Sequence, residues 1–309
     1  MTPQTPPCPL CGADSTYALN AWDRNRETTA ERFAYNRCKA CATVFMRDVP
    51  KSLAPYYAGD YHRFAADGTP EWTRDPTLLA VEQFRVRMLR AHVQPGALID
   101  IGAGPGAFAA AAKRAGFAVT AIEMDERSCA YMRDVLGVRA ICSDDPIAQL
   151  QALEPARVIS LWHSLEHLRD PAATLAAAAA RLQDGGVLAL GVPNPRSLQF
   201  RLLGSRWPHL DAPRHLSLMP AQALLAHGRT LGLRCLELTT NDPFGLACNV
   251  HGWAYALRRR PAAGPASPAV GQAAGIIAKL ASPVERSGNR GAALTVLLEK
   301  PAAEQRISA

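Results

Sequence analysis

Hydrophobic and polar positions along the chain predict strands and helices that follow one another in turn. Short apolar runs indicate buried strands, and the longer stretches between them place apolar residues at helical spacing. The expected strands lie at residues 97–101, 118–122, 138–142, 157–161, 186–190, 233–238 and 293–298, and the expected helices include 76–93, 107–115 and 219–225. Strands that alternate with helices predict an α/β fold with a doubly wound, largely parallel sheet.

A glycine-rich loop follows the first of these strands. Gly102, Gly104 and Gly106 stand between the strand at 97–101 and an alanine-rich helix at 107–115. A strand, a glycine turn and a helix N-terminus form a site for a nucleotide-like ligand, because small residues let the ligand approach the free backbone N–H groups. The loop by itself also fits a dinucleotide, with Glu123 about 20 residues further on to bind a ribose.

Polar residues stand at the ends of the next strands. Asp100, Glu123, Asp144 and His163 all fall at or just after the carboxyl end of a predicted strand. Because ligands of open α/β sheets bind outside the carboxyl ends of the strands, we expect these side chains to share one site.

Taken together, these segments resemble the class I S-adenosylmethionine (SAM)-dependent methyltransferases over roughly residues 85–300. The motifs that carry the resemblance are Asp100-x-Gly102-x-Gly104-x-Gly106, Glu123, Asp144, the run from Trp162 to Pro171, and Asp184-Gly-Gly186. The resemblance implies a seven-stranded Rossmann-like methyltransferase sheet, SAM as the cofactor, and methyltransferase activity.

The resemblance also implies which residues contact the cofactor. They are Asp100, Gly102, Gly104, Gly106, Glu123, Asp144 and Trp162. Glu123 is expected to accept hydrogen bonds from the ribose hydroxyls and Asp144 from the adenine amine, and carboxylates suit such donors. Asp145 is an alternative to Asp144.

Four of the eight cysteines have the spacing of metal ligands. Cys8 and Cys11 form one pair with a two-residue gap, and Cys38 and Cys41 form another. Four thiolates satisfy tetrahedral zinc, and such a set leaves no open position for water. We therefore predict a structural zinc ribbon, with a redox pair as the alternative; the four other cysteines are expected to be core residues.

Histidines are the candidates for the catalytic base. Methyl transfer from a sulfonium needs alignment and, where the acceptor carries a proton, a base, for which histidine suits neutral pH. His163 and His167 follow the fourth strand, whereas His215 follows Arg214 in the connection after the fifth. The pair Arg214-His215 is the favoured substrate-facing pair, with a structural hydrogen-bonding role for His215 as the alternative.

The front of the chain and the segment after the fifth strand also resemble a subgroup of bacterial small-molecule methyltransferases. These share an N-terminal zinc ribbon and a histidine-bearing segment that caps the active site. The expected organisation is a small N-terminal zinc ribbon at residues 1–50, a connecting segment and leading helix at 51–96, and the methyltransferase domain at 97–309. A substrate-capping insertion is expected at about 195–220.

Positive charge is concentrated in the C-terminal third of the chain. The formal net charge is +7, and residues 195–309 hold 14 basic and 6 acidic residues. This balance favours an anionic acceptor over a neutral one. The leading hypothesis is a small-metabolite acceptor such as a sugar, lipid or polyketide-type precursor.

Two further hypotheses stay open. One is methylation of ribosomal or transfer RNA, with Trp207 and Trp253 stacking on bases beside basic residues. The other is a non-catalytic scaffold that binds the cofactor. The oligomeric state is not determined by the sequence.

The N-terminal segment and the apolar runs indicate a cytoplasmic protein. Residues 1–7 are polar and proline-rich, unlike a signal peptide. The longest apolar run, residues 172–180, is far shorter than the roughly 20 residues of a membrane span. We therefore expect no membrane span.

Overall fold

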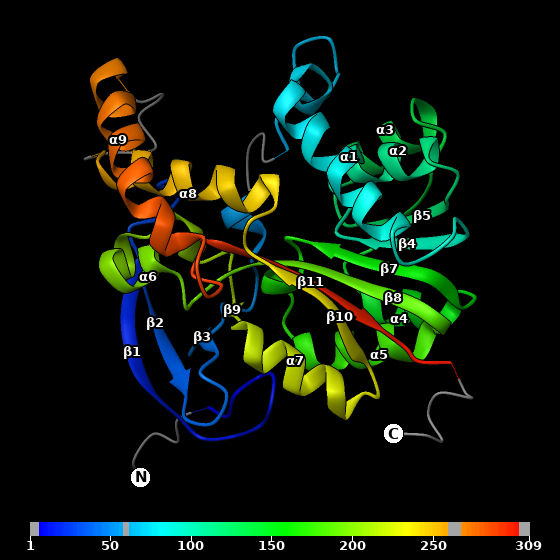
Figure 1. The fold of residues 1–309 in the computed structure, drawn as a ribbon, viewed down its shortest axis with the longest axis horizontal. Helices are drawn as coiled ribbons and strands as arrows, with labels where there is room; N and C mark the ends of the chain where they lie inside the picture. Colours follow the sequence, from blue (N-terminus) through cyan, green and yellow to red (C-terminus); the bar gives the residue numbers. More distant parts are fainter. Residues whose placement is uncertain (1–5, 58–61, 259–266, 303–309) are drawn as a thin grey trace.

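The chain is built on two β-sheets, one of seven strands and one of four (Figure 1). A computed structural model describes residues 6–57, 62–258 and 267–302. The predicted methyltransferase domain ends at residue 309, so its last seven residues lie outside the described part.

The large sheet has the order β10-β11-β8-β7-β4-β5-β6. Its strands are β4 (Ala97–Ile101), β5 (Ala118–Glu123), β6 (Arg139–Cys142), β7 (Ala156–Trp162), β8 (Leu182–Pro193), β10 (Arg234–Thr239) and β11 (Ala293–Glu299). Every pair from β6 to β8 is parallel, and β11 runs antiparallel to both of its neighbours. The predicted seven-stranded α/β sheet is confirmed.

Helices cover both faces of this sheet, as Figure 1 shows. On one face lie α1 (Pro76–Arg90), α2 (Ala107–Arg114) and α3 (Glu126–Asp134), and on the other lie α4 (Pro146–Ala152), α5 (Pro171–Arg181) and α7 (Ala221–Thr230). Each face has its own apolar core, one including Leu89, Phe108 and Met132 and the other Leu150 and Leu175. The sheet is thus buried on both faces, which explains its continuous apolar strands.

Aspartates set where many of these helices begin. Asp75, Asp125, Asp145, Asp170 and Asp242 each accept a hydrogen bond from a backbone N–H in the first turn that follows. Except after Asp125, a proline occupies the start of the helix, where its missing N–H costs nothing. Similarly, Pro220 precedes α7, so that helix begins at Ala221 instead of the predicted 219.

The small sheet joins the front of the chain to the segment predicted to cap the active site. Its order is β1-β2-β3-β9, with β1 (Ser15–Trp22), β2 (Arg32–Cys38), β3 (Val44–Met46) and β9 (Ser217–Leu218). Strand β9 pairs antiparallel with β3 through Val44 and Phe45. The N-terminal module is therefore completed by residues from the second half of the chain.

The described part of the chain contains further helices. They are α6 (Leu198–Leu203), α8 (Pro243–Ala256), α9 (Pro268–Glu285) and five short 3-10 helices: η1 (Ala54–Tyr57), η2 (Glu71–Arg74), η3 (Leu165–His167), η4 (Gly204–Arg206) and η5 (Pro208–Leu210). Trp253 of α8 packs with Ala274 and Ala278 of α9. In the ranges that the structure describes, none of the helices is long and apolar enough to cross a membrane.

A buried ion pair connects the N-terminal module to the capping segment, the insertion predicted at about 195–220. Arg214 is fully buried and donates to Asp23 at 2.6 Å and to Asp211 at 2.7 Å. Burial alone would raise the pKa of Asp211, but Arg214 lowers it to about 2. The expectation that Arg214 faces the substrate is wrong. Its guanidinium donates hydrogen bonds to the two carboxylates and to the carbonyl of Tyr56.

Candidate functional site

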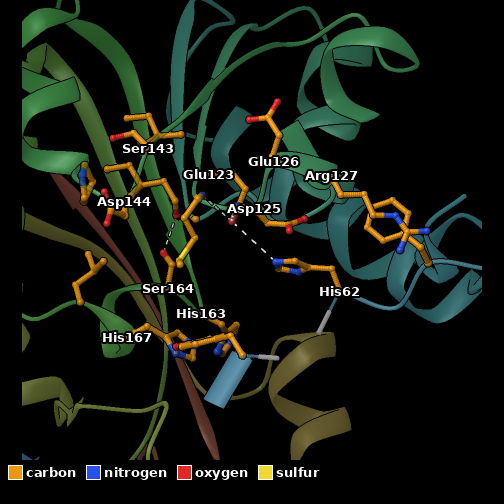
Figure 2. Close-up of a pocket in the computed structure, with 18 residues that line it drawn as sticks. His62, Glu123, Asp125, Glu126, Arg127, Ser143, Asp144, His163, Ser164 and His167 are labelled. Carbon is orange, nitrogen blue, oxygen red and sulfur yellow. Dashed lines mark hydrogen bonds and ion pairs between the residues drawn. The ribbon is translucent and has the colours of Figure 1, made fainter. Parts of the chain in front are cut away.

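A cavity of about 490 Å³ opens at the carboxyl ends of the parallel strands (Figure 2). The residues around it include Gly102 after β4, Glu123 at the end of β5, Asp144 after β6 and His163 after β7. The fold therefore brings three of the four predicted strand-end side chains together with Gly102 of the glycine loop. His167 also lines the cavity, through η3.

The loop after β4 requires its glycines. Gly102 and Gly106 have φ angles of +69° and +83°, which L residues with a side chain rarely adopt. A Cβ atom on Gly102 would lie 2.4 Å from the Cβ of Ser164, and one on Gly106 would lie 2.6 Å from the Cγ of Met132. Only glycine therefore lets the loop take these backbone angles and pack this closely against Ser164 and Met132.

Backbone N–H groups fix the Glu123 carboxylate at the end of β5. Its two oxygens accept from the N–H of Gly104 at 2.7 Å, Met124 at 2.8 Å and Asp125 at 3.0 Å. Three of about four lone-pair positions of a carboxylate are then used, so acceptor capacity for a hydroxyl remains. In Figure 2 the ring of His62 points toward this carboxylate, with Nε2 3.9 Å from Oε1. This geometry fits a ribose.

The two aspartates after β6 differ in position. Asp144 is exposed and lines the cavity beside Ser143. Asp145 accepts from the N–H of Ala148 at 3.0 Å and caps α4. Asp144 therefore has the better position for a cofactor amine, and Asp145 has a structural role.

Four predicted cofactor residues, Asp100, Gly104, Gly106 and Trp162, are not among the described lining residues of this cavity. Asp100 is buried, and the hydroxyl of Ser160 donates to it at 2.7 Å. Trp162 packs edge-on against Phe108 at 5.5 Å between ring centroids, and the guanidinium of Arg85 lies 4.4 Å from its ring centroid. Their contact with the cofactor stays a prediction.

The environment of Asp100 predicts a dependence of stability on pH. Burial raises the pKa of Asp100 from 3.8 to about 7, so the folded state favours the neutral acid. This contribution to the free energy of unfolding is complete below pH 3.8 and is lost as the pH rises toward 7. Relative to the wild type, Asp100→Asn is expected to gain stability between pH 4 and pH 7, by at most about 1.4 kcal/mol per pH unit, as measured by urea unfolding.

The exposed residue Asp134 offers the matched control for this measurement. Asp134→Asn is expected to follow the wild-type pH profile. A constant difference between Asp100→Asn and the wild type from pH 4 to pH 8 would contradict the prediction.

The three predicted catalytic histidines surround Glu166. His163 and His167 line the cavity, while His215 is not among its described lining residues and lies behind them. The Nδ1 atom of His163 lies 3.5 Å, and Nε2 of His215 4.0 Å, from Oε1 of Glu166. His163 has a φ angle of +56°, a strained conformation that is common at functional sites.

Protonation in this group follows from burial and neighbouring charge. Burial lowers the pKa of His167 to about 4, and charge on His215 acts in the same direction. Burial alone would raise the pKa of Glu166, but His163, and then His215, hold it below its usual range. The group therefore contains a carboxylate anion and, in His167, a neutral imidazole at pH 7.

The four paired cysteines converge as the spacing predicts. Sulfur atoms are 3.6 Å apart for Cys8 and Cys41, and 3.5 Å apart both for Cys11 and Cys38 and for Cys11 and Cys41. Four sulfurs bonded to one zinc ion at 2.3 Å are separated by roughly 3.8 Å.

Both cysteine pairs form the same turn. The N–H of Gly12 donates to the carbonyl of Cys8, and that of Ala42 donates to Cys38, and Gly12 and Ala42 both have positive φ angles. The donor set, its spacing and its turns fit a structural zinc ion.

Loss of one ligand is expected to release this ion. Cys8→Ser is predicted to lower the metal content by about one equivalent per chain and to destabilise the N-terminal module, because binding energy of a structural zinc contributes to folding. Mass spectrometry under native conditions and limited proteolysis would measure both effects. Cys142→Ser, at an exposed cysteine outside the cluster, is the control. Unchanged metal content in Cys8→Ser would contradict a zinc ribbon.

Sequence reasoning missed two residues of the connecting segment. Tyr57 and His62 line the cavity, and the hydroxyl of Tyr57 lies 2.9 Å from Nδ1 of His167. Figure 2 shows His62 opposite Glu123, on the far side from Ser143 and Asp144. The sequence signal for these residues was that the polar connecting segment contains aromatic side chains. No spacing rule, however, relates residues of this segment to the ends of the strands.

The basic C-terminal third contributes to a second cavity, of about 800 Å³, beside the N-terminal module. Its described lining includes four arginines and no carboxylate: Arg37, Arg196, Arg201 and Arg290. Trp207 and Trp253, the expected stacking residues for RNA, are 2% and 8% exposed and pack in the interior. They are therefore not available to stack on bases.

Comparison with known proteins agrees with this geometry. A family model described as a methyltransferase domain matches residues 73–238, more than half of the chain. The ubiquinone biosynthesis O-methyltransferase of Bordetella bronchiseptica is 29% identical over 147 residues, which cover 44% of this chain and 61% of that protein. Its counterpart from Bordetella pertussis is 30% identical over 124 residues, which cover 38% of this chain and 52% of that protein.

The matches thus span about half to six-tenths of the length of these relatives. A SAM-dependent methyltransferase from Archaeoglobus fulgidus superposes with a TM-score of 0.50 at 18% identity, covering 74% of this chain and 97% of that one, and shares the fold. The chain belongs to the methyltransferase domain family, and its sheet is that of the class I SAM-dependent methyltransferases.

Proposed function

We propose that this chain transfers the methyl group of SAM to an oxygen atom of a small-molecule acceptor. The observation that carries the proposal is the cavity that joins Gly102, Glu123 and Asp144 on one side to His163 and His167 on the other. The named activity of the O-methyltransferase relatives supports oxygen as the acceptor atom.

The proposed cofactor side is the glycine loop with the two carboxylates. Bound SAM supplies a methyl group on a positively charged sulfur. Glu123, already oriented by three backbone N–H groups, accepts from the ribose hydroxyls, and Asp144 accepts from the adenine amine. Such fixed acceptors orient the cofactor and keep the methyl group aligned with the acceptor.

The proposed acceptor side is the histidine end of the cavity. The acceptor oxygen forms a bond to the methyl carbon, the carbon–sulfur bond breaks with its electron pair on sulfur, and the hydroxyl proton moves to His163. Glu166, 3.5 Å from Nδ1 of His163, stabilises the imidazolium that results.

His215 is proposed to support turnover without contacting the cofactor. His215→Ala is expected to lower the turnover number by about 10²-fold or more, within the range of general acid–base effects, and to leave the affinity for SAM unchanged. His92→Ala, at an exposed histidine, is the control. A parallel loss of SAM affinity in His215→Ala would contradict this assignment.

The acceptor class is proposed from size and charge. A cavity of about 490 Å³ has to hold the cofactor as well as the acceptor, which favours a small metabolite such as a sugar, lipid or polyketide-type precursor. An anionic group on the acceptor is proposed from the positive charge of residues 195–309, part of which lines the second cavity. Activity that falls steeply with ionic strength, through a rising KM, is the expected signature.

Isothermal titration calorimetry with SAM tests the proposal and separates it from the other hypotheses. Binding together with methyl transfer from labelled SAM to a metabolite pool is the expected result. Binding without transfer to any pool would favour a non-catalytic scaffold. Transfer to RNA, with salt-dependent RNA binding, would favour an RNA methyltransferase, and no binding at millimolar SAM would overturn both enzyme hypotheses.

A further inference from the structure

Three potential metal ligands converge directly behind the histidine end of the cavity. Glu166, His167 and His215 each offer one atom, and these atoms all lie within 4.8 Å of one another. Glu166 and His167 belong to η3, whereas His215 comes from the capping segment. His167 also lines the cavity, so the cluster adjoins the space proposed for the acceptor.

The carboxylate of Glu166 has no adequate protein partner. Its side chain is fully buried, and within the described chain neither oxygen accepts a hydrogen bond. The nearest ring nitrogens, those of His163 and His215, lie 3.5 and 4.0 Å away, beyond hydrogen bonds of good geometry. A buried carboxylate in this situation is costly unless a positive charge compensates it.

Backbone carbonyls lie beside the Nδ1 atoms of both histidines. Nδ1 of His215 lies 2.8 Å from the carbonyl oxygen of His209, and Nδ1 of His167 lies 3.1 Å from that of Arg214. Because a carbonyl can only accept, Nδ1 of His215 carries the proton, and its Nε2 is the atom that can bind a metal ion. Nδ1 of His167 also lies 2.9 Å from the hydroxyl of Tyr57, and a proton on this Nδ1 leaves Nε2 of His167 as the second ligand. Metal-binding histidines show this same arrangement, in which the second nitrogen donates to a carbonyl.

From this geometry we propose that Glu166, His167 and His215 bind a divalent transition-metal ion of the Zn²⁺ class. Two imidazole nitrogens and one carboxylate oxygen are a donor set that zinc accepts, and three protein ligands leave a position open for a further oxygen. Bonds of about 2.1 Å require ligand atoms roughly 3.4 Å apart in a tetrahedral site. The 4.0 Å between Glu166 and His215 therefore has to shorten by well under 1 Å.

An ion bound by His167 would adjoin the cavity, because His167 lines it. A metal ion there would bind the acceptor oxygen and lower the pKa of its hydroxyl, so that His163 receives the proton more readily. Glu166 can still accept from His163, since a carboxylate offers about four lone-pair positions. This catalytic role rests on the proposed methyl transfer, whereas the metal site itself does not.

Metal counting on the full chain tests the proposal. The protein is stripped with a chelator, dialysed against Zn²⁺ and analysed by plasma mass spectrometry. Glu166→Gln, which preserves shape but removes the anion, is expected to bind one equivalent less than the wild type. Glu285→Gln changes another buried carboxylate, one that already accepts from Gln199 and Trp253, and is expected to keep the wild-type count.

Co²⁺ substitution separates this site from the four cysteines. Cobalt bound to thiolates shows strong sulfur charge-transfer absorption, and cobalt bound to nitrogen and oxygen does not. Glu166→Gln is expected to bind one equivalent of cobalt less while the sulfur charge-transfer band persists, and Cys8→Ser is expected to lose that band while the second site persists. Equal metal counts and spectra for Glu166→Gln and the wild type would overturn the proposal.

The thermal midpoint of Glu166→Gln, compared with the wild type, shows whether the variant is folded, and His215→Gln provides a second variant that removes a ligand. Both variants must lose the same equivalent for the proposal to stand. SAM binding, measured separately by calorimetry, distinguishes the proposed metal site from the proposed methyl transfer. If the chain binds SAM and transfers methyl groups but the wild type binds no metal equivalent that these variants lose, the metal site alone is overturned.

Discussion

Arg214→Met is expected to lower the free energy of unfolding by about 3–5 kcal/mol, the usual cost of removing one member of a buried ion pair. The guanidinium donates to both Asp23 and Asp211, so its loss leaves two carboxylates close together without a cation. Because Asp23 belongs to the N-terminal module and Asp211 to the capping segment, the contact between these two parts should loosen first. Urea unfolding measures the first effect and limited proteolysis the second.

The matched control for Arg214→Met is Arg229→Met, which removes an exposed arginine from α7. Its expected effect lies within about 0.5 kcal/mol, as for most surface substitutions. Equal stability of the two variants would show that the buried pair contributes nothing net to folding.

Glu123→Ala is expected to weaken the affinity for SAM by about 10- to 100-fold, because hydrogen bonds to a charged group contribute roughly 1.5–3 kcal/mol. The substitution removes the acceptor for the ribose and also the carboxylate that accepts from the N–H of Gly104. Calorimetry with SAM measures the loss directly, without any knowledge of the acceptor.

Glu154→Ala, at an exposed glutamate that is not among the described lining residues of the cavity, is the control for this variant. It is expected to bind SAM as the wild type does. Unchanged affinity in Glu123→Ala, with a thermal midpoint that shows a folded protein, would mean that another residue holds the ribose.

Local sequence signals predicted most of the large sheet. All seven predicted strands form, and the first, Ala97–Ile101, has the predicted bounds. The reason is that strands buried on both faces are continuous apolar runs, while aspartate and proline mark the helix starts between them. The predicted strand at 186–190 proves longer, Leu182–Pro193, because it pairs with β7 from Leu182 and with β11 as far as Pro193.

The part of the site that follows the strand ends was also predictable. Gly102, Glu123, Asp144 and His163 come together because parallel strands place their carboxyl ends at one edge of the sheet. Residues outside that rule were not predictable. Tyr57 and His62 reach the cavity from a segment without regular periodicity, and Arg214 turned out to be an internal ion-pair residue.

The sequence by itself determined the alternating α/β order, the glycine loop, the strand-end carboxylates and the paired cysteines, because each depends on neighbours within a few residues or on the direction of parallel strands. The tertiary structure decided the rest. It added β9 to the N-terminal sheet, joined Asp23 to Arg214 and brought His215 to Glu166. These contacts join residues about 50 to 190 positions apart, and they depend on how the capping segment packs, which no local spacing in the chain encodes.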